Sequence, residues 1–137
     1  ILGKDKVRRF VLVGMGNLGR TLVRYGGFET SGIKIVAGFD IDAAQYNEEG
    51  NIPILPLERI TDYIGNQNIE FAIIAVPDFA AQQVLELMLP AGIKGVLNFA
   101  PICLKGPEGC VINNINLVTE LENIIYFVNA ARQTKEC

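Results

Sequence analysis

Short apolar runs alternate with segments whose apolar residues recur every three or four positions, and this rhythm predicts buried strands joined by helices. The predicted strands cover residues 9–14, 33–40, 51–55, 70–76, 95–99 and 110–112. The predicted helices cover residues 17–25, 57–64, 78–89 and about 116–132. Nearly continuous apolar strands favour parallel pairing with helices on both faces. The sequence therefore predicts an α/β fold with a doubly wound, mostly parallel sheet.

Glycine and proline mark the ends of these elements. Gly26 and Gly27 are predicted to end the first helix, and Pro53 places the third strand towards an edge of the sheet, because proline cannot donate to a strand ladder. In sheets of this class ligands bind beyond the carboxyl ends of the strands, where the winding direction reverses. We therefore expect the functional residues directly after the strands.

Composition narrows the class of protein. The chain has 137 residues, the length of one domain, and no apolar run approaches the about 18 residues that a membrane span needs. It contains no histidine, which excludes Ser–His catalysis and His-ligated zinc. The first residue is Ile1, so we expect a processed product or a piece of a longer chain.

Charge and cysteine content disfavour nucleic acid and metal as direct ligands. The formal net charge is −3, although six of the twelve basic residues lie in the first 24 positions. That cluster is either a solvated approach to the first strand or a basic edge facing something upstream. The spacing of Cys103, Cys110 and Cys137 fits neither metal nor redox motifs and predicts a reducing compartment, with a cytoplasmic location.

The turn after the first predicted strand carries a dinucleotide-binding pattern. Residues 14–19 read Gly-Met-Gly-Asn-Leu-Gly, a GxGxxG match between a strand and a helix. Gly14 permits the tight turn, Gly16 lets a pyrophosphate approach the backbone, and Gly19 allows the helix to pack closely on the sheet. Free N–H groups at the helix start would bind the phosphates, as in Rossmann-type sites.

Asp40, at the end of the second strand, makes the pattern more specific. It lies 21 residues after Gly19, where a carboxylate can accept hydrogen bonds from the ribose hydroxyls of adenosine. Its charge would repel a 2′-phosphate, and no arginine or lysine follows in residues 41–44. The sequence predicts NAD⁺ or NADH rather than NADP(H); the alternative is that Asp40 only caps a turn.

The ends of the fourth and fifth strands are predicted to line the nicotinamide half. Val76 and Pro77 follow the fourth strand, and Asn98, Phe99 and Pro101 lie at the end of the fifth. An apolar backbone edge followed by proline can hold a ring without reacting with it, and Asn98 could hydrogen-bond a carboxamide. Ordinary strand-end turns are the alternative at each of these positions.

Together these segments resemble the Rex-type redox-sensing transcriptional repressors. The resemblance rests on residues 14–28, 39–40, 75–77 and above all 91–101, Ala-Gly-Ile-Lys-Gly-Val-Leu-Asn-Phe-Ala-Pro, and it covers essentially the whole chain. It implies a dimerising NAD(H)-binding domain over residues 1–137, with residues 1–3 at the junction to an N-terminal winged-helix domain absent from this sequence. The implied function is release of operator DNA, contacted only by that missing domain, when the NADH/NAD⁺ ratio is high.

The resemblance also assigns roles to single residues. The implied cofactor-binding residues are Gly14, Met15, Gly16, Asn17, Leu18, Gly19, Asp40, Ile41, Val76, Pro77, Asn98, Phe99 and Pro101. Tyr25 matches a family tyrosine that hydrogen-bonds across the dimer to an aspartate near the start of the last helix. Asn116 stands at that aspartate's position, so an acceptor is kept and the charge is lost.

The closing helix is predicted to be a dimer contact. Its apolar residues, Leu117, Leu121 and Ile124 among them, occupy more than one face, so burial by a partner subunit is expected, with an ordinary core helix as the alternative. In the Rex-type family this helix is exchanged between subunits. The resulting expectation is a homodimer without membrane or metal contacts.

A dehydrogenase domain and a separate nucleotide-binding domain are the two alternatives to a sensor. Dehydrogenases of the glucose-fructose oxidoreductase type place Glu-Lys-Pro at the end of the fifth strand, whereas residues 98–101 here read Asn-Phe-Ala-Pro and contain no lysine. A separate CoA- or nucleotide-binding domain is the third possibility, and Asp40 argues against it because it suits an unphosphorylated ribose. The sequence favours a sensor without a catalytic residue.

Overall fold

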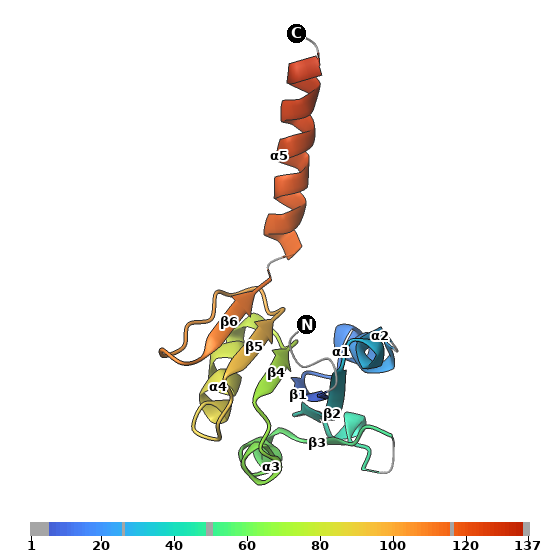
Figure 1. Ribbon diagram of the computed structural model, residues 1–137, viewed down its shortest axis with the longest axis vertical. Helices are drawn as coiled ribbons and strands as arrows, with labels where there is room; N and C mark the ends of the chain where they lie inside the picture. The colour runs from blue at the N-terminus through green and yellow to red at the C-terminus, as the bar shows by residue number, and fades with distance from the viewer. Residues whose placement is uncertain (1–5, 26, 49–50, 116, 136–137) are drawn as a thin grey trace.

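The computed structural model describes residues 6–25, 27–48, 51–115 and 117–135, in which strands and helices alternate (Figure 1). The first half contains β1 (Arg8–Val13), α1 (Asn17–Arg24), α2 (Gly27–Thr30), β2 (Ile33–Asp40), the 3₁₀ turn η1 (Ala43–Gln45) and β3 (Ile54–Pro56). The second half contains the 3₁₀ turn η2 (Leu57–Arg59), α3 (Ile60–Gln67), β4 (Phe71–Ile74), α4 (Asp78–Met88), β5 (Gly95–Asn98), β6 (Val111–Asn114) and α5 (Leu117–Lys135).

The strands of the described residues form one parallel sheet in the order β3-β2-β1-β4-β5-β6. The chain winds outward from β1 through β2 to β3, and then outward in the other direction from β4 through β5 to β6. The reversal lies between β1 and β4, so the carboxyl ends of these two strands flank the place where ligands bind in such sheets. The predicted doubly wound α/β class is confirmed, and the sheet is wholly parallel.

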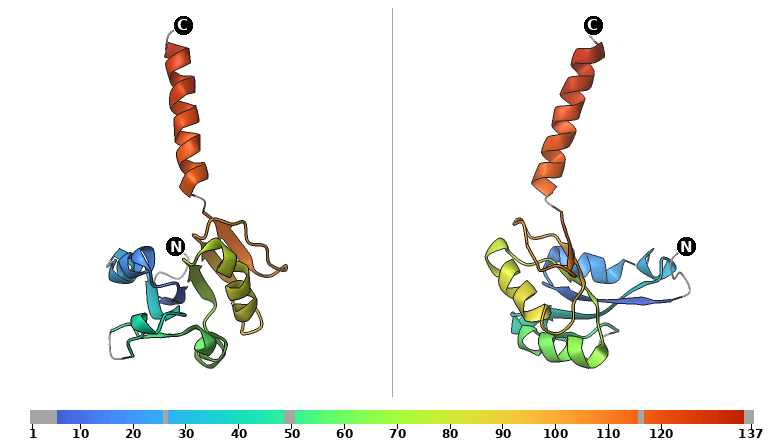
Figure 2. Two further views of the ribbon diagram at one scale, coloured as in Figure 1. Left: turned by 180° about the vertical axis from the view of Figure 1, so that it is seen from behind. Right: turned by 60° about the vertical axis from the view of Figure 1, so that its left-hand side comes forward.

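Two apolar layers hold helices against the sheet. The larger core lies on the side of α3 and α4, where Ile60, Ile64, Leu85 and Met88 are fully buried against the strands. A smaller core on the other side joins Leu12, Met15, Ile35 and Ile73 to partly buried residues of α1 and α2. Figures 1 and 2 show these helix pairs on opposite faces of the sheet. Burial of these residues supplies the main favourable free energy of folding.

Helix α5 stands away from the sheet (Figures 1 and 2). Its large apolar side chains are exposed to between 44% and 68%, namely Leu121, Ile124, Ile125, Tyr126, Phe127 and Val128. These residues therefore find no core in their own chain. In the part of the chain that the structure describes, no helix combines the length and the apolarity that crossing a membrane requires.

Most predicted elements are present, with shifted ends. The second strand has the predicted bounds, and the edge position of the third is confirmed. That strand starts at Ile54, after Pro53 and not before it, because its parallel pairing with β2 begins where Ile54 lies opposite Gly38. The predicted junction at residues 1–3 and the predicted helix start at Asn116 lie outside the described residues.

The first helix ends close to its predicted stop at Gly26 and Gly27. Gly27 also begins the short helix α2, which was not predicted. Helix α1 ends at Arg24, and the ring of Tyr25 folds back so that a Cβ on Gly27 would overlap it. Tyr25 also packs edge-on against Phe28, with ring centroids 4.8 Å apart. A side chain on Gly27 would therefore displace the ring of Tyr25, a contact that the sequence pattern does not show.

Candidate functional site

The turn after β1 lies in close contact with the ends of β2 and β4, the two strands beside β1. Gly14 has a φ of +100°, which favours glycine, and its N–H donates to the carbonyl oxygen of Phe39 at 2.8 Å. A Cβ on Gly14 would overlap the carbonyl oxygen of Ala75, and a Cβ on Gly19 would overlap the carbonyl oxygen of Gly14. These two glycines are needed for the turn to fit against the sheet and for α1 to start against the turn.

Gly16 differs from both because the fold does not require its small size. No described atom lies within 4 Å of the position that its Cβ would take, and its φ of −72° is one that any residue adopts. It occupies the N-cap of α1, where no side chain caps the helix and no acidic residue lies in the first turn. The first N–H groups of a helix have no partner within it, so this end of α1 presents donors and open space to an anion.

Asp40 joins this turn to the end of β2. Its Oδ2 accepts a hydrogen bond from the N–H of Met15 at 2.7 Å, and its Oδ1 accepts one from the N–H of Asp42 at 2.8 Å. Each carboxylate oxygen has two lone pairs, so both can accept a further hydrogen bond. The half-buried carboxylate thus lies directly beside the glycine turn with accepting capacity left for a hydroxyl group.

The segment after Asp40 forms one wall of the site. Ile41 is 77% exposed, so an apolar side chain is offered to solvent next to the carboxylate. The side chain of Asp42 caps the 3₁₀ turn by accepting from the N–H of Ala44 at 3.0 Å. Arg20 of α1 donates to the Gln45 side chain at 2.5 Å and fastens this wall to the helix. An exposed apolar residue here suits the flat face of an adenine ring.

The other wall comes from the ends of β4 and β5. Val76 is half-buried, with its Cγ1 3.1 Å from the position that a Cβ on Gly14 would take, and Pro77 is exposed at the N-cap of α4. Phe99 is half-buried and Pro101 exposed, in the loop that follows β5. The structure therefore brings the predicted residues of the fourth and fifth strands to the same edge as the glycine turn.

Asn98 does not match the role expected for it. Its side chain has no exposed surface, and its Oδ1 accepts from the N–H of Ala100 at 2.9 Å. Its Nδ2 donates to the carbonyl oxygen of Ile102 and to Oδ1 of Asn114, both at 2.8 Å. The amide is committed to neighbouring protein groups, so a direct hydrogen bond to a carboxamide conflicts with the arrangement observed.

Two residues at this edge were not foreseen from the sequence. Phe79, in the first turn of α4, is 79% exposed, and Asn114 at the end of β6 bonds to Asn98. The helical spacing contained the signal for Phe79, because Ala81, Leu85 and Met88 form the buried face of α4 and Phe79 lies off it. No pattern in the sequence indicates the pairing of the two asparagines.

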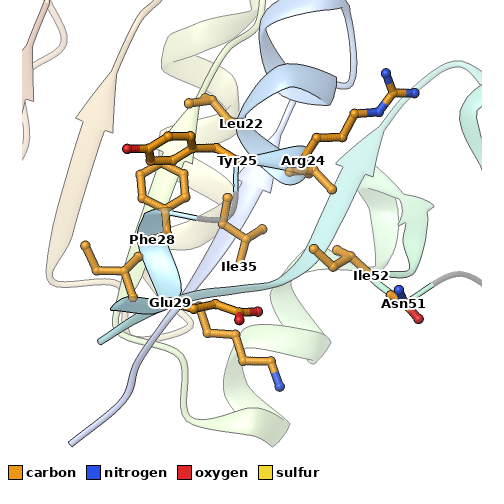
Figure 3. A pocket seen from close by; sticks show the side chains of 11 residues that line it. Leu22, Arg24, Tyr25, Phe28, Glu29, Ile35, Asn51 and Ile52 are labelled. Atoms are coloured by element: carbon orange, nitrogen blue, oxygen red, sulfur yellow. The ribbon is translucent and has the colours of Figure 1, made fainter. Parts of the chain in front are cut away.

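A cavity of about 580 Å³ lies elsewhere, between the end of α1, α2 and the start of β2 (Figure 3). Leu22, Tyr25, Phe28 and Ile35 surround it, so it opens near the amino end of β2 and not at the edge that carries the glycine turn. Tyr25, predicted as a dimer residue, is 59% exposed at its rim. We place the candidate site at the carboxyl edge, because the predicted phosphate donors and the predicted ribose acceptor lie there.

The predicted dimer residues are Tyr25, Asn116 and three residues of α5. Asn116 lies outside the described residues, so its pairing with Tyr25 stays a prediction. Leu117 begins α5, and Leu121 and Ile124 on the same helix are 60% and 59% exposed. These last two residues are available for contact with another subunit.

The two cysteines of the described residues are free and do not belong to a metal-type cluster. Cys103 is exposed, and burial raises the pKa of the half-buried Cys110 thiol above its ordinary value, which lowers its thiolate fraction at neutral pH. No three Cys, Asp or Glu side chains of the described residues cluster as a metal site would.

Comparison with known proteins agrees with this geometry. The family model described as CoA binding domain matches residues 5–102. The redox-sensing transcriptional repressor Rex of Oenococcus oeni is 37% identical over 135 residues, which is 94% of this chain and 61% of the relative. Its counterpart in Streptococcus pyogenes serotype M5 is 36% identical over 132 residues, with 94% and 62% covered. The chain thus spans about three-fifths of these relatives.

Solved structures place the fold in the same group. RSP, a Rex-family repressor, in complex with β-NAD⁺ and operator DNA, superimposes with a TM-score of 0.88 at 31% identity, covering 98% of this chain and 63% of that chain. The complex of RSP with β-NADH has a TM-score of 0.86 at the same identity. Both the sequence relatives and RSP are described as repressors of the Rex family. The chain belongs to the CoA-binding domain family and is a homologue of the Rex-family redox-sensing repressors.

Proposed function

We propose that this chain is an NAD(H)-binding sensor domain, which holds the dinucleotide across the carboxyl edge between β2 and β5. The observation that carries the proposal is the hydrogen bond of 2.7 Å between the Met15 N–H and the Asp40 carboxylate. It supports the proposal because it brings the predicted phosphate-binding turn next to the predicted ribose acceptor. The solved complexes of RSP with NAD⁺ and with NADH support the choice of ligand.

Asp40 supports NAD(H) over nucleotides with a phosphorylated ribose. Its carboxylate lies where the adenosine ribose would sit, and a phosphate there would meet a like charge at short range. Residues 41–44 contain no lysine or arginine, and the guanidinium of Arg20 at this wall donates to the Gln45 side chain. The same argument separates the domain from coenzyme A, whose ribose is phosphorylated, although the family takes its name from CoA.

The nicotinamide side supports discrimination between the two redox states. Val76, Phe99 and Pro101 present apolar groups, and no lysine or histidine stands at residues 98–101 to take part in chemistry on the ring. An apolar site favours the uncharged ring of NADH over the cationic ring of NAD⁺, because desolvating a charge costs free energy. Differential binding of this kind is what allows a ligand to shift a conformational equilibrium.

The link to DNA is a proposal about a longer protein. The domain has a net charge of −3, which suits neither the phosphates of DNA nor its grooves. We place operator contact in a winged-helix domain preceding this chain, as the resemblance implies, with NADH favouring release. The RSP complex with operator DNA supports that arrangement.

The exposed apolar surface of α5 supports a homodimer. On the sheet, the face that carries α1 is left uncovered over β5 and β6, where Leu97 and Phe99 are half-buried and Val111 is 74% exposed. Among the described residues, the strip over β5 and β6 lacks an apolar cover, and α5, an apolar helix about 28 Å long, lacks an apolar surface to pack on. Packing one against the other in a dimer would bury both. We propose that α5 of one subunit packs against its partner, with Tyr25 and Asn116 in the interface.

Calorimetric titration of the domain with NADH and with NAD⁺ tests the sensing role. We expect NADH to bind at least about tenfold more tightly, which corresponds to about 1.4 kcal/mol of differential free energy. NADPH serves as the control and should bind more weakly than NADH because of Asp40. Equal affinities for the two redox forms would contradict sensing, and steady oxidation of NADH with 2-oxo acids would favour a dehydrogenase.

Substitution of Gly16 at the N-cap of α1 and of Gly19 within α1 separates binding from folding. Gly16→Ala is expected to leave the thermal midpoint unchanged, since its Cβ enters open space, and to weaken NADH binding about tenfold or more by blocking the phosphates. Gly19→Ala is expected to lower the free energy of unfolding by about 1–3 kcal/mol, because its Cβ overlaps Gly14. Unimpaired NADH binding by Gly16→Ala would argue against a pyrophosphate at this turn.

Charge placed on α5 tests the dimer. Ile124→Asp should shift the sedimentation equilibrium of the chain from dimer to monomer, because a charge buried in an apolar interface lacks a partner. Asn123→Asp adds the same charge at the adjacent exposed residue and is the matched control. A monomeric unmodified chain, or a dimer that survives Ile124→Asp unchanged, would count against α5 as the interface.

A further inference from the structure

Two asparagine side chains join the loop after β5 to the end of β6. Asn98 is the last residue of β5 and Asn114 the last of β6, and the Nδ2 of Asn98 donates to Oδ1 of Asn114 at 2.8 Å. Oδ1 of Asn114 also accepts from the N–H of Leu104 at 2.9 Å, and its Nδ2 donates to the carbonyl oxygen of Leu104 at 3.1 Å. The backbone N–H and the carbonyl oxygen of Leu104 are thus both hydrogen-bonded to the side-chain amide of Asn114.

The same pair fixes the segment that carries the predicted ring contacts. Asn98 holds Ala100 and Ile102 by their backbone groups, one on each side of Pro101. Among the described residues, no buried side-chain nitrogen or oxygen lacks a hydrogen-bond partner. A fully bonded amide pair in a buried setting is rigid, because displacing either end leaves polar groups unpaired. Residues 99–104 and the end of β6 are therefore expected to move as one rigid unit.

The chain leads directly from this pair to the helix proposed as the dimer contact. The N–H of Ile115 donates to the carbonyl oxygen of Asn98 at 2.8 Å, and α5 begins at Leu117. The root of α5 is thus bonded to the residue that begins the ring-side loop. The side-chain hydrogen bonds of the described chain that join this loop to β6 are those of Asn114 with Asn98, Cys103 and Leu104.

We propose that Asn114, acting through Asn98, is a positioning residue that couples the nicotinamide side of the site to the orientation of α5. The inference rests on the proposed function, since it names the residues through which the redox state of the nicotinamide ring would affect the orientation of α5. A ring seated against Phe99 and Pro101 shifts the loop, and the asparagine pair carries that shift to the root of α5. Asn98 has a structural part in this path and makes no contact with the ligand.

The test uses the 137-residue chain and a ligand pair that differs only at the ring. NADH contains nicotinamide, whereas ADP-ribose contains the adenosine, pyrophosphate and second ribose without it. Calorimetry gives both affinities for the unmodified chain, for Asn114→Ala, and for Asn66→Ala as the matched control on the exposed surface of α3. Hydrogen–deuterium exchange of residues 117–135 with and without NADH reports the response of α5.

In the unmodified chain and in Asn66→Ala, NADH should change exchange in α5 by about threefold or more, and ADP-ribose should not. Asn114→Ala should weaken NADH binding about threefold to tenfold, leave ADP-ribose affinity within about twofold, and abolish the exchange response of α5. A role confined to stability would weaken both ligands alike. Equal weakening of both ligands, or an α5 response kept in Asn114→Ala, overturns the inference.

Failure of the coupling and failure of the proposed function give different results. If neither NADH nor ADP-ribose binds the unmodified chain, the proposed function is contradicted and the coupling falls with it. If NADH binds but α5 does not respond in the unmodified chain, only the coupling is overturned. Should Asn114→Ala fail to fold, Asn114→Ser, which keeps one polar group, is judged by the same outcomes.

Discussion

The hydrogen bond between the Met15 N–H and the Asp40 carboxylate is the interaction on which the proposed site depends. It links the turn after β1 to the end of β2, so the helix end proposed for the phosphates and the acceptor proposed for the ribose have a fixed separation. Gly14 and Gly19 make that approach possible, because a side chain on either would collide with a neighbouring carbonyl group. The adenosine half of the site is thus built before any ligand arrives, which lowers the entropic cost of binding.

The two halves of the proposed site differ in how they are held. The adenosine half is fixed by backbone contacts between adjacent strands, whereas the ring half depends on a loop without helix or strand between β5 and β6. Side-chain amides hold that loop, and the same amides reach the root of α5. This division suits the proposed sensor, in which one half would anchor the ligand regardless of redox state and the other would respond to the ring and lead to the proposed dimer contact.

Local patterns in the sequence predicted the features that depend on neighbouring residues. Apolar periodicity located the strands and helices, and the glycine spacing predicted the tight turn between β1 and α1, because strand, turn and helix follow one another directly in the chain. Contacts between distant side chains were beyond such patterns. The pairing of Asn98 with Asn114 and the ring of Tyr25 over Gly27 arise from tertiary packing, so Asn98 was assigned to the ligand and Gly27 to a helix stop.

A crystal structure of the chain grown with NADH tests the central claim most directly. The account predicts pyrophosphate oxygens within about 3.2 Å of N–H groups at the start of α1 beside Gly16, and ribose hydroxyls at hydrogen-bond distance from Asp40. The nicotinamide ring should lie against Val76 and the loop after β5. Density for the dinucleotide in the cavity beside Tyr25 and Phe28, or away from the carboxyl edge of the sheet, would contradict it.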